Sequence, residues 1–271
     1  MTSASEWNAR EYAQIASLQA EMAAEVLALL EFDGLERVLD VGCGDGKITA
    51  QIASRVPHGT VIGVDASHKM VAYASTHFGS DVWPNLRFQV GDVRSLGFSN
   101  EFDLIVSLNA LHWVPDQDAA LHSIATALKP DGLAQLRLVP KGERTSLEEV
   151  IERTRCSPRW SSYFREFSDP YLHSTPEEYV AIAERNGLQV LHLKTASRAW
   201  DFKSRAAFAA SCSVTLVAWT QRLPEDERMV FINDVLDRYR ATTAGSEGSG
   251  ENTFLFYQMD ITAKRRRTSK P

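Results

Sequence analysis

The sequence of 271 residues predicts an α/β protein built on a doubly wound sheet. Three observations support this fold class. Apolar runs that read as buried strands alternate with stretches of helical periodicity. The first three runs each end in an acidic residue or a glycine turn, at the edge where open α/β sheets bind ligands. The fourth run, at 102–116, is almost continuously apolar, as a strand buried on both faces requires.

The first part of the chain follows this alternation closely. Ile15, Leu18, Met22 and Val26 recur at helical spacing, which predicts an amphipathic helix over 8–30. Glycine and proline breaks separate the elements that follow. We expect a strand at 38–41, a helix near 46–55, a strand at 61–67, a helix at 68–78, a strand at 86–93, the strand at 102–116, a helix at 117–128 and, within 128–138, a Pro-Asp-Gly turn into a fifth strand.

The later part of the chain changes character. Residues 139–173 are rich in arginine, serine and aromatic residues and show no sheet periodicity. A capped helix start at 174–177 follows. After that helix we expect a strand at 188–196, a mostly helical stretch at 203–240, a loop at 244–252 and a strand at 253–263. These elements predict one domain over 1–263, with a core at about 32–138, 174–196 and 251–263, lid insertions at about 139–173 and 197–240, and a disordered basic tail at 264–271.

The glycine turn after the first strand is the strongest functional signal. Residues 38–49 read VLDVGCGDGKIT, which is an apolar strand, a glycine bend and a helix start. Glycines suit a bend that approaches a ligand closely, because a Cβ would obstruct it. The spacing is GxGxG and departs from the dinucleotide pattern GxGxxG, whose third glycine would fall at Lys47. This departure argues against the alternative of a nucleotide-binding dehydrogenase.

Acidic residues end the next two strands. Asp65 comes one helix and one strand after the glycine turn, so we expect its carboxylate at the neighbouring strand tip, within reach of a ribose diol. The alternative is that Asp65 caps the helix that begins near Ser67. Asp92 follows the third strand, where it can accept from the amine of an adenine while an adjacent backbone N–H reaches a ring nitrogen.

Composition sets further bounds. Hydrophobic residues make up 44% and charged residues 24%, as in soluble globular proteins, and the sequence shows neither a signal pattern nor an apolar run that would span a bilayer. The net charge is −6, and because the last stretch is basic the body is more acidic still, which argues against a nucleic-acid substrate. The three cysteines lie far apart, so we expect a cytoplasmic protein without a metal site.

The pattern DxGxGxG at 40–46, with the acids after the second and third strands, resembles the motifs of class I S-adenosylmethionine (SAM) methyltransferases. Order and spacing fit that superfamily over 35–138. The resemblance implies a seven-stranded Rossmann-like sheet with a largely helical lid, SAM as cofactor and S-adenosylhomocysteine as product. It places the cofactor beside Tyr12, Asp40, Gly42, Cys43, Gly44, Asp65, Ala66, Asp92, Val93 and Asn109.

A narrower resemblance concerns the methyl acceptor. Ser17-Leu18-Gln19 and LNALHWVPDQD at 108–118 look like the juvenile hormone acid and fatty-acid O-methyltransferases, with the trans-aconitate methyltransferases as near neighbours. In that group a glutamine on the first helix and a tryptophan after the fourth strand are associated with holding the acid, and they correspond to Gln19 and Trp113. The resemblance implies esterification of a fatty, terpenoid or polycarboxylic acid. We expect a monomer or homodimer with no nucleic-acid or membrane partner.

The chemistry of methyl transfer suits such an acceptor. In-line displacement depends on alignment, and a carboxylate is ionised at neutral pH, so it needs no general base. A dry, apolar lid helps because the two opposite charges cancel as the ester forms. Three alternatives stay open: Trp113 is plain core, His112 is a structural group or is the base for a phenol, amine or carbon acceptor, or the protein binds SAM without turnover. Asp116 and Asp118 read as helix caps rather than metal ligands.

Overall fold

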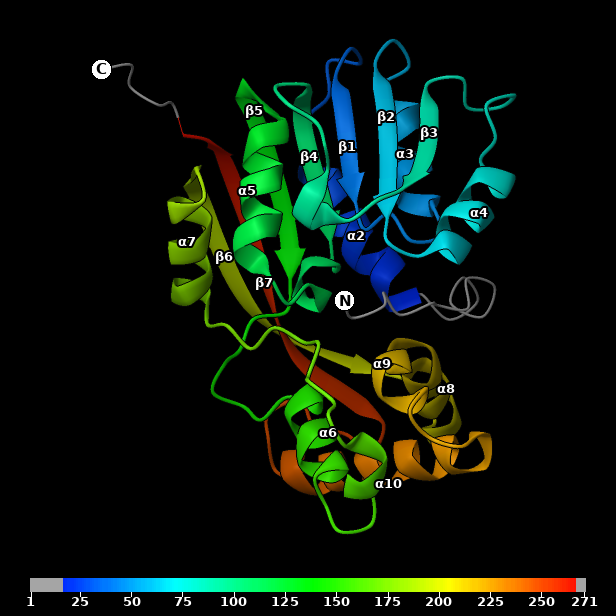
Figure 1. The fold of residues 1–271 in the computed structure, drawn as a ribbon. Helices are drawn as coiled ribbons and strands as arrows, with labels where there is room; N and C mark the ends of the chain where they lie inside the picture. The colour runs from blue at the N-terminus through cyan, green and yellow to red at the C-terminus, as the bar shows by residue number, and fades with distance from the viewer. Residues whose placement is uncertain (1–16, 267–271) are drawn as a thin grey trace.

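The structure, a computed structural model, describes residues 17–266. A seven-stranded sheet runs through it in the order β3-β2-β1-β4-β5-β7-β6 (Figure 1). The first five of these strands pair in parallel, whereas β7 is antiparallel to both β5 and β6. The reversed β7 distinguishes this sheet from the 3-2-1-4-5-6 order of dinucleotide-binding domains. The predicted α/β class and the seven-stranded sheet are confirmed.

The elements have the following bounds. The strands are β1 (Arg37–Val41), β2 (Thr60–Asp65), β3 (Leu86–Val90), β4 (Phe102–Leu108), β5 (Leu128–Leu138), β6 (Leu188–Asp201) and β7 (Thr253–Arg265). The helices that flank the sheet are α2 (Ser17–Leu29), α3 (Lys47–Arg55), α4 (His68–His77), α5 (Gln117–Ala127) and α7 (Pro176–Arg185). Four more helices stand apart from the sheet: α6 (Leu147–Arg155), α8 (Arg205–Thr215), α9 (Val217–Thr220) and α10 (Glu225–Thr243).

Apolar side chains cover the sheet on both faces. On one face α5 and α7 contribute Leu121 and Tyr179 to a core that includes Leu39 of β1. On the other face Leu27 of α2 and Ile52 of α3 pack against the sheet. This two-sided burial is the reason that β1, β2 and β4 read as continuous apolar runs.

Two expected strand ends are wrong by five residues or more. The strand expected over 102–116 ends at Leu108, because Asn109 takes a left-handed backbone with φ of +59° and a 3₁₀ turn follows at Leu111–Trp113. The strand expected over 188–196 continues to Asp201, which pairs with Thr253 of β7. The expected lid boundary at 197 therefore falls inside the sheet. Residues 8–16 of the expected first helix lie outside the described residues.

The basic tail also begins later than expected. Lys264 and Arg265 belong to β7, and Arg265 donates from Nη1 to the carbonyl of Leu128 at 3.1 Å. The N–H of Arg266 donates to the carbonyl of Gly187 at 2.7 Å. The prediction of a disordered tail from 264 is wrong for these three residues, because the sheet supplies partners for their backbone. Residues 267–271 lie outside the described residues.

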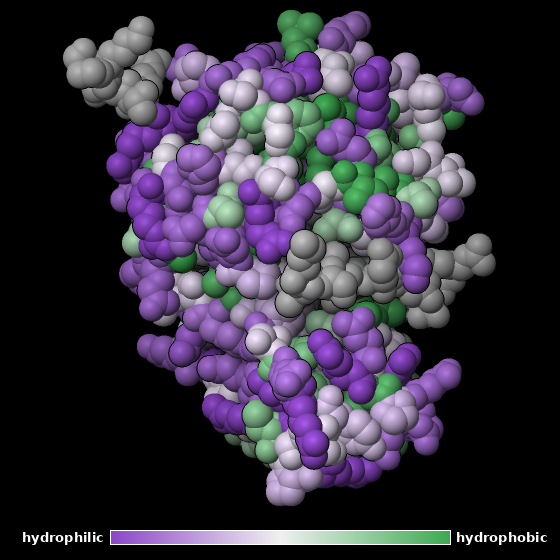
Figure 2. Space-filling model, viewed as in Figure 1, coloured by the Kyte–Doolittle hydropathy of each residue, from purple (hydrophilic) through white to green (hydrophobic). Residues whose placement is uncertain are grey.

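The four remaining helices and the turn Ser161–Phe164 form a cap with an apolar core of its own. Trp160, Trp219 and Phe231 are fully buried in it. The cap lies below the carboxyl ends of the parallel strands in Figure 1, and polar residues cover most of its visible face in Figure 2. Among residues 17–266 no helix combines the length and apolar character needed to cross a membrane.

A network of charges around the buried Arg137 fastens α2 to the sheet. Arg137 of β5 is 2% exposed and donates from Nε and Nη2 to Asp260 of β7 at 2.6 and 2.9 Å. Its Nη1 donates to the carbonyl of Met22 and to Glu25 of α2. Arg198 of β6 also pairs with Glu25. The fork geometry of the guanidinium fixes where α2 lies along the sheet edge.

Candidate active site at the carboxyl edge of the sheet

The glycine loop after β1 has three residues in left-handed backbone, with φ of +78° at Gly42, +53° at Gly44 and +82° at Gly46. The N–H groups of Gly42 and Cys43 both donate to the carbonyl of Val64, at 2.7 and 3.1 Å, and tie the loop to β2. A Cβ on Gly42 would lie 2.1 Å from the Cβ of Ala110. A Cβ on Gly44 would have no atom of the described residues within 4 Å, so the loop borders open space in that part of the structure.

Asp65 at the tip of β2 braces this loop. Its Oδ2 accepts from the N–H of Gly44 at 2.9 Å, and its Oδ1 accepts from the N–H of Ser67 at 2.9 Å. The cap of α4 is Ser67, whose Oγ accepts from the N–H of Met70 at 3.3 Å. Asp65 therefore sits beside the glycine loop, as the sequence predicts, with exposed Ala66 next to it.

Asp92 is held by a partner that the sequence reasoning missed. Both of its carboxylate oxygens accept from Nε of Arg94 at 3.0 Å, and Oδ1 also accepts from the N–H of Arg94. This hydrogen bonding by Arg94 lowers the pKa of the Asp92 carboxyl. Val93 is buried between them. The carboxylate at this strand end is therefore already paired with a cation. An arginine two positions after Asp92 was the available sequence signal for this ion pair.

Asp40 and Cys43 lie beneath the loop rather than on its surface. Asp40 is 3% exposed, and its Oδ2 accepts from the hydroxyl of Thr49 on α3 at 2.7 Å. Burial raises the pKa of Asp40 to about 7. Burial also raises the pKa of the Cys43 thiol well above its usual value. Both residues support the loop from inside the fold, and contact with a cofactor stays a prediction for them.

Polar groups after β4 face a cavity. The N–H of Asn109 donates to the carbonyl of Arg137 at 2.8 Å, and its Oδ1 is buried without a hydrogen-bond partner among the described residues. Nδ1 of His112 accepts from the N–H of Val139 at 3.4 Å, so the proton of the neutral ring is on Nε2. Burial lowers the pKa of His112 to about 3. His112 is therefore a neutral, weakly basic group at this place.

Trp113 stands in an aromatic cluster between the sheet and the cap. Its ring meets Tyr171 edge-on at 5.1 Å and Trp219 of the cap at 6.0 Å between centroids. The predicted partner Gln19 is in α2, one position after Leu18, and its side chain is outside the described part of the structure. Tyr12 also lies outside the described residues.

These elements line a main cavity between the sheet edge and the cap, with about 770 Å³ of empty space that includes its opening to solvent. Leu18 and Met22 of α2 line it, together with Asn109, His112 and Trp113 after β4. Its other described lining is mostly apolar, contains no lysine or arginine, and includes one acid, Glu148 of α6. Within residues 17–266, no group of three or more His, Cys, Asp or Glu residues could hold a metal ion.

Glu148 is a second residue that the sequence reasoning missed. Its place follows from the start of α6, where Ser146 and Glu149 form a capping box with hydrogen bonds of 3.1 and 2.9 Å. The spacing Ser-x-x-Glu was the available signal for this helix start. It turns the next residues, Leu147 and Glu148, toward the main cavity.

Comparisons with known proteins agree with this geometry. A family model described as a methyltransferase domain matches residues 38–132. A trans-aconitate 2-methyltransferase of Deinococcus radiodurans is 36% identical over 140 residues, which is 52% of this chain and 52% of the relative. A trans-aconitate 2-methyltransferase of Shigella dysenteriae is 26% identical over 267 residues, which is 96% of this chain and 99% of the relative.

Solved structures share the fold. The YcgJ protein of Bacillus subtilis has a TM-score of 0.64 at 24% identity and covers 92% of this chain and 100% of its own. Phosphoethanolamine N-methyltransferase 2 of Haemonchus contortus, solved with SAM, has a TM-score of 0.62 at 17% identity and covers 96% of this chain and 57% of its own. With the glycine loop and the sheet order, the methyltransferase-domain match and the trans-aconitate relatives support a class I SAM-dependent methyltransferase near the trans-aconitate group, and the solved structures show the shared fold.

Proposed function

We propose that this enzyme transfers the methyl group of SAM to the carboxylate of a small hydrophobic acid, of the fatty or terpenoid kind. The main cavity carries the proposal, because it is mostly apolar, has no lysine or arginine in its described lining and meets the glycine loop's edge of the sheet. We further expect a cytoplasmic monomer or homodimer that acts on neither nucleic acid nor membranes.

The residues at the strand ends fit SAM. Within residues 17–266, open space borders Gly44, and the Oδ1 of Asn109, which has no partner there, offers an acceptor to a ligand donor. A carboxylate has about four acceptor sites, so the two backbone bonds of Asp65 are compatible with ribose hydroxyls. Asp92 and the N–H of Val93 would hold the adenine. When bound, SAM supplies an electrophilic methyl group on a sulfonium.

The state of His112 favours a carboxylate over a phenol or an amine. Those acceptors must lose a proton to a base with a pKa near the working pH, and His112 has a pKa of about 3. A carboxylate is already ionised at neutral pH. The chain then only has to align the acceptor oxygen and exclude water, which Trp113 and the apolar cavity wall do.

The same cavity disfavours acids with several carboxylates, trans-aconitate included. Each extra carboxylate that leaves water costs several kcal/mol unless a cation pairs with it. No cation lines the main cavity among the described residues. The relatives' names therefore support the reaction class, and the cavity supports a more hydrophobic acid.

A transfer assay with methyl-labelled SAM tests the proposal. Fatty and terpenoid acids should give labelled methyl esters, while the primary alcohol and the amide of the same carbon skeleton should give none. Polycarboxylates and phenols complete the panel. Faster transfer to a phenol, an amine or a polycarboxylate than to any hydrophobic monocarboxylic acid would contradict the proposal.

A further inference from the structure

The main cavity contains one acid that the proposed reaction does not use. Glu148, in the first turn of α6, is 6% exposed, and its Oε2 has no hydrogen-bond partner among the described residues. Nor does it form an ion pair within residues 17–266. A buried polar atom in this state calls for a partner, which a ligand that enters the cavity can supply.

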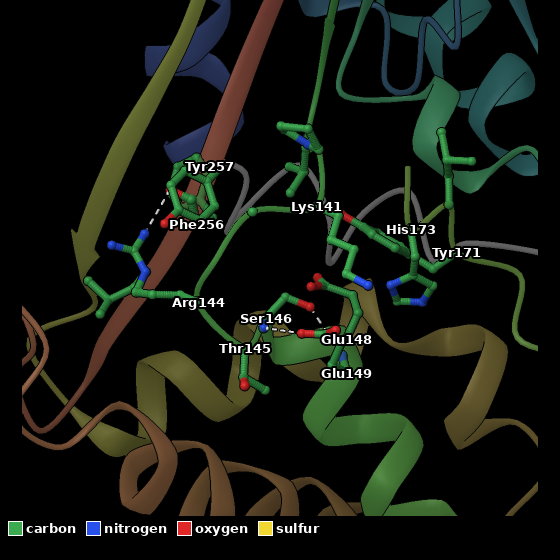
Figure 3. A pocket seen from close by; sticks show the side chains of 15 residues that line it. Lys141, Arg144, Thr145, Ser146, Glu148, Glu149, Tyr171, His173, Phe256 and Tyr257 are labelled. Carbon is green, nitrogen blue, oxygen red and sulfur yellow. Dashed lines mark hydrogen bonds between the residues drawn. The ribbon is translucent and has the colours of Figure 1, made fainter. Parts of the chain in front are cut away.

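Glu148 also lines a second, smaller cavity. This cavity, with about 420 Å³ of empty space that includes its opening to solvent, lies where the cap joins the sheet, and Figure 3 shows Glu148 there beside Lys141 and His173. Glu148 thus separates the two cavities, and His173 is held away by Asp169, whose Oδ2 lies 2.7 Å from its Nε2. The lysine is exposed, and the histidine is engaged by Asp169, so neither forms an ion pair with Glu148.

Burial favours the neutral form of Glu148. It raises the pKa of the carboxyl against the opposing effects of hydrogen bonds from the Glu148 N–H and from Ser146 and of the charge of His173, and the charge of Asp169 adds to the rise. Burial raises the pKa values of Tyr171, Tyr239 and the Cys212 thiol and lowers the pKa of His112, so these four groups are neutral at pH 7. The titratable and charged groups around Glu148 are Lys141, Arg144, Glu149, Asp169, Tyr171, His173, Cys212 of α8, Tyr239 of α10 and, across the main cavity, His112.

We propose that Glu148, in its neutral protonated form, recognises the carboxylate of the methyl acceptor. The O–H of Glu148 donates a hydrogen bond to one carboxylate oxygen of the substrate, and the other oxygen attacks the methyl group. This inference rests on the proposed carboxylate acceptor. Two carboxyl groups that share a water-poor site hold one proton between them, because both cannot ionise there. An ionised Glu148 would repel the negatively charged acceptor. The cavity therefore binds a carboxylate only while Glu148 is protonated.

The proton stays on Glu148 during transfer. The attacking acceptor oxygen forms the bond to the methyl carbon, and the electron pair of the carbon–sulfur bond goes to sulfur. Glu148 then donates to the carbonyl oxygen of the ester. The acid therefore selects and positions the acceptor without acting as a base, and no proton is released or taken up in this step.

The role predicts a specific pH dependence. Above the pKa of Glu148 in the free enzyme, kcat/KM for the acid should fall about tenfold per pH unit, since binding then requires a proton. The negative charge of the bound acceptor raises the pKa of Glu148 further in the complex. The fall in kcat should therefore lie at a higher pH than the fall in kcat/KM.

The test compares Glu148→Gln and Glu148→Ala, with Glu177→Gln on the exposed surface of α7 as the matched control. The glutamine keeps the shape and a permanent donor, so Glu148→Gln should retain activity and lose the alkaline fall in kcat/KM. Glu148→Ala should raise KM for the acid at least tenfold with little change in SAM affinity. Titration calorimetry with S-adenosylhomocysteine and the acid, in buffers of different ionisation enthalpy and at a pH on the alkaline fall of kcat/KM, should show proton uptake for the wild type and the control only.

Two outcomes would overturn the inference. If Glu148→Gln were inactive and the wild-type rate rose with pH, Glu148 would be a general base. If ester formed in all three variants with wild-type pH profiles and proton uptake, Glu148 would not touch the acceptor. Failure of the proposed function looks different, because the wild type would then form no ester with any acid.

Discussion

Adding one methyl group to the glycine loop should be among the most damaging small changes in this enzyme. Gly42→Ala places an L side chain at φ of +78°, which costs about 1–2 kcal/mol. The new Cβ would also lie 2.1 Å from the Cβ of Ala110, and relieving such an overlap costs about 1–3 kcal/mol. We expect a loss of about 2–5 kcal/mol in the free energy of unfolding. SAM affinity should fall more than tenfold, because the shift displaces Asn109 beside Ala110.

Two controls separate backbone strain from overlap. Gly97→Ala has φ of +74° with no atom within 4 Å of the new Cβ, so it should cost only about 1–2 kcal/mol and leave SAM binding unchanged. The double variant Gly42→Ala/Ala110→Gly removes the overlap and should recover about 1–3 kcal/mol. Urea denaturation measures stability and calorimetry measures SAM affinity. A double variant as unstable as Gly42→Ala, or a Gly42→Ala protein as stable as Gly97→Ala, would refute this reasoning.

Other substitutions test the remaining parts of the site. Asp65→Ala should weaken SAM binding more than tenfold in calorimetry, since it removes the brace of Gly44 and the ribose acceptor; unchanged affinity would contradict the ribose role. Because the folded pKa of Asp40 is raised from 3.8 to about 7, the folded state keeps a proton there that the unfolded chain has lost, and stability declines as pH rises through that window. The wild type should lose at most about 4 kcal/mol in the free energy of unfolding by pH 8, and Asp40→Asn should remove this loss. Parallel pH profiles of urea unfolding for the wild type and Asp40→Asn would contradict the role of Asp40. His112→Ala should lower kcat only modestly, whereas Trp113→Phe should raise KM for the acid by the equivalent of about 1–3 kcal/mol; a dead His112→Ala enzyme in the transfer assay would instead mark a base.

The sequence predicted the parts of the fold in which local and global signals agree. The strand, glycine bend and helix at 38–55 fall within a residue or two of their observed bounds, because buried parallel strands give continuous apolar runs. Asp116 caps α5, as expected, by accepting from the N–H of Ala119 at 3.0 Å. Asp118 instead pairs with Arg185 of α7.

What the sequence did not show depends on contacts between distant segments. The extension of β6 to Asp201 escaped prediction because the strand is largely exposed and a bulge near Val190 breaks its alternation. The pairing of Arg137 with Asp260 joins residues far apart in the chain, and no local pattern announces it. Glu148 was missed for the same reason, since only the packed cap brings it to the main cavity.

The separate core of the cap has a consequence for how the sequence of such an enzyme evolves. The side chains that would hold SAM come from strand ends of the sheet, whereas Glu148 and Phe208 of the main cavity come from helices packed around Trp160 and Trp219. Substitutions in two cores that share few contacts add their effects on stability nearly independently. Substitutions in the cap can therefore change acceptor preference one at a time without destabilising the part of the protein that would hold SAM. A cap exchanged between relatives should transfer its acceptor preference.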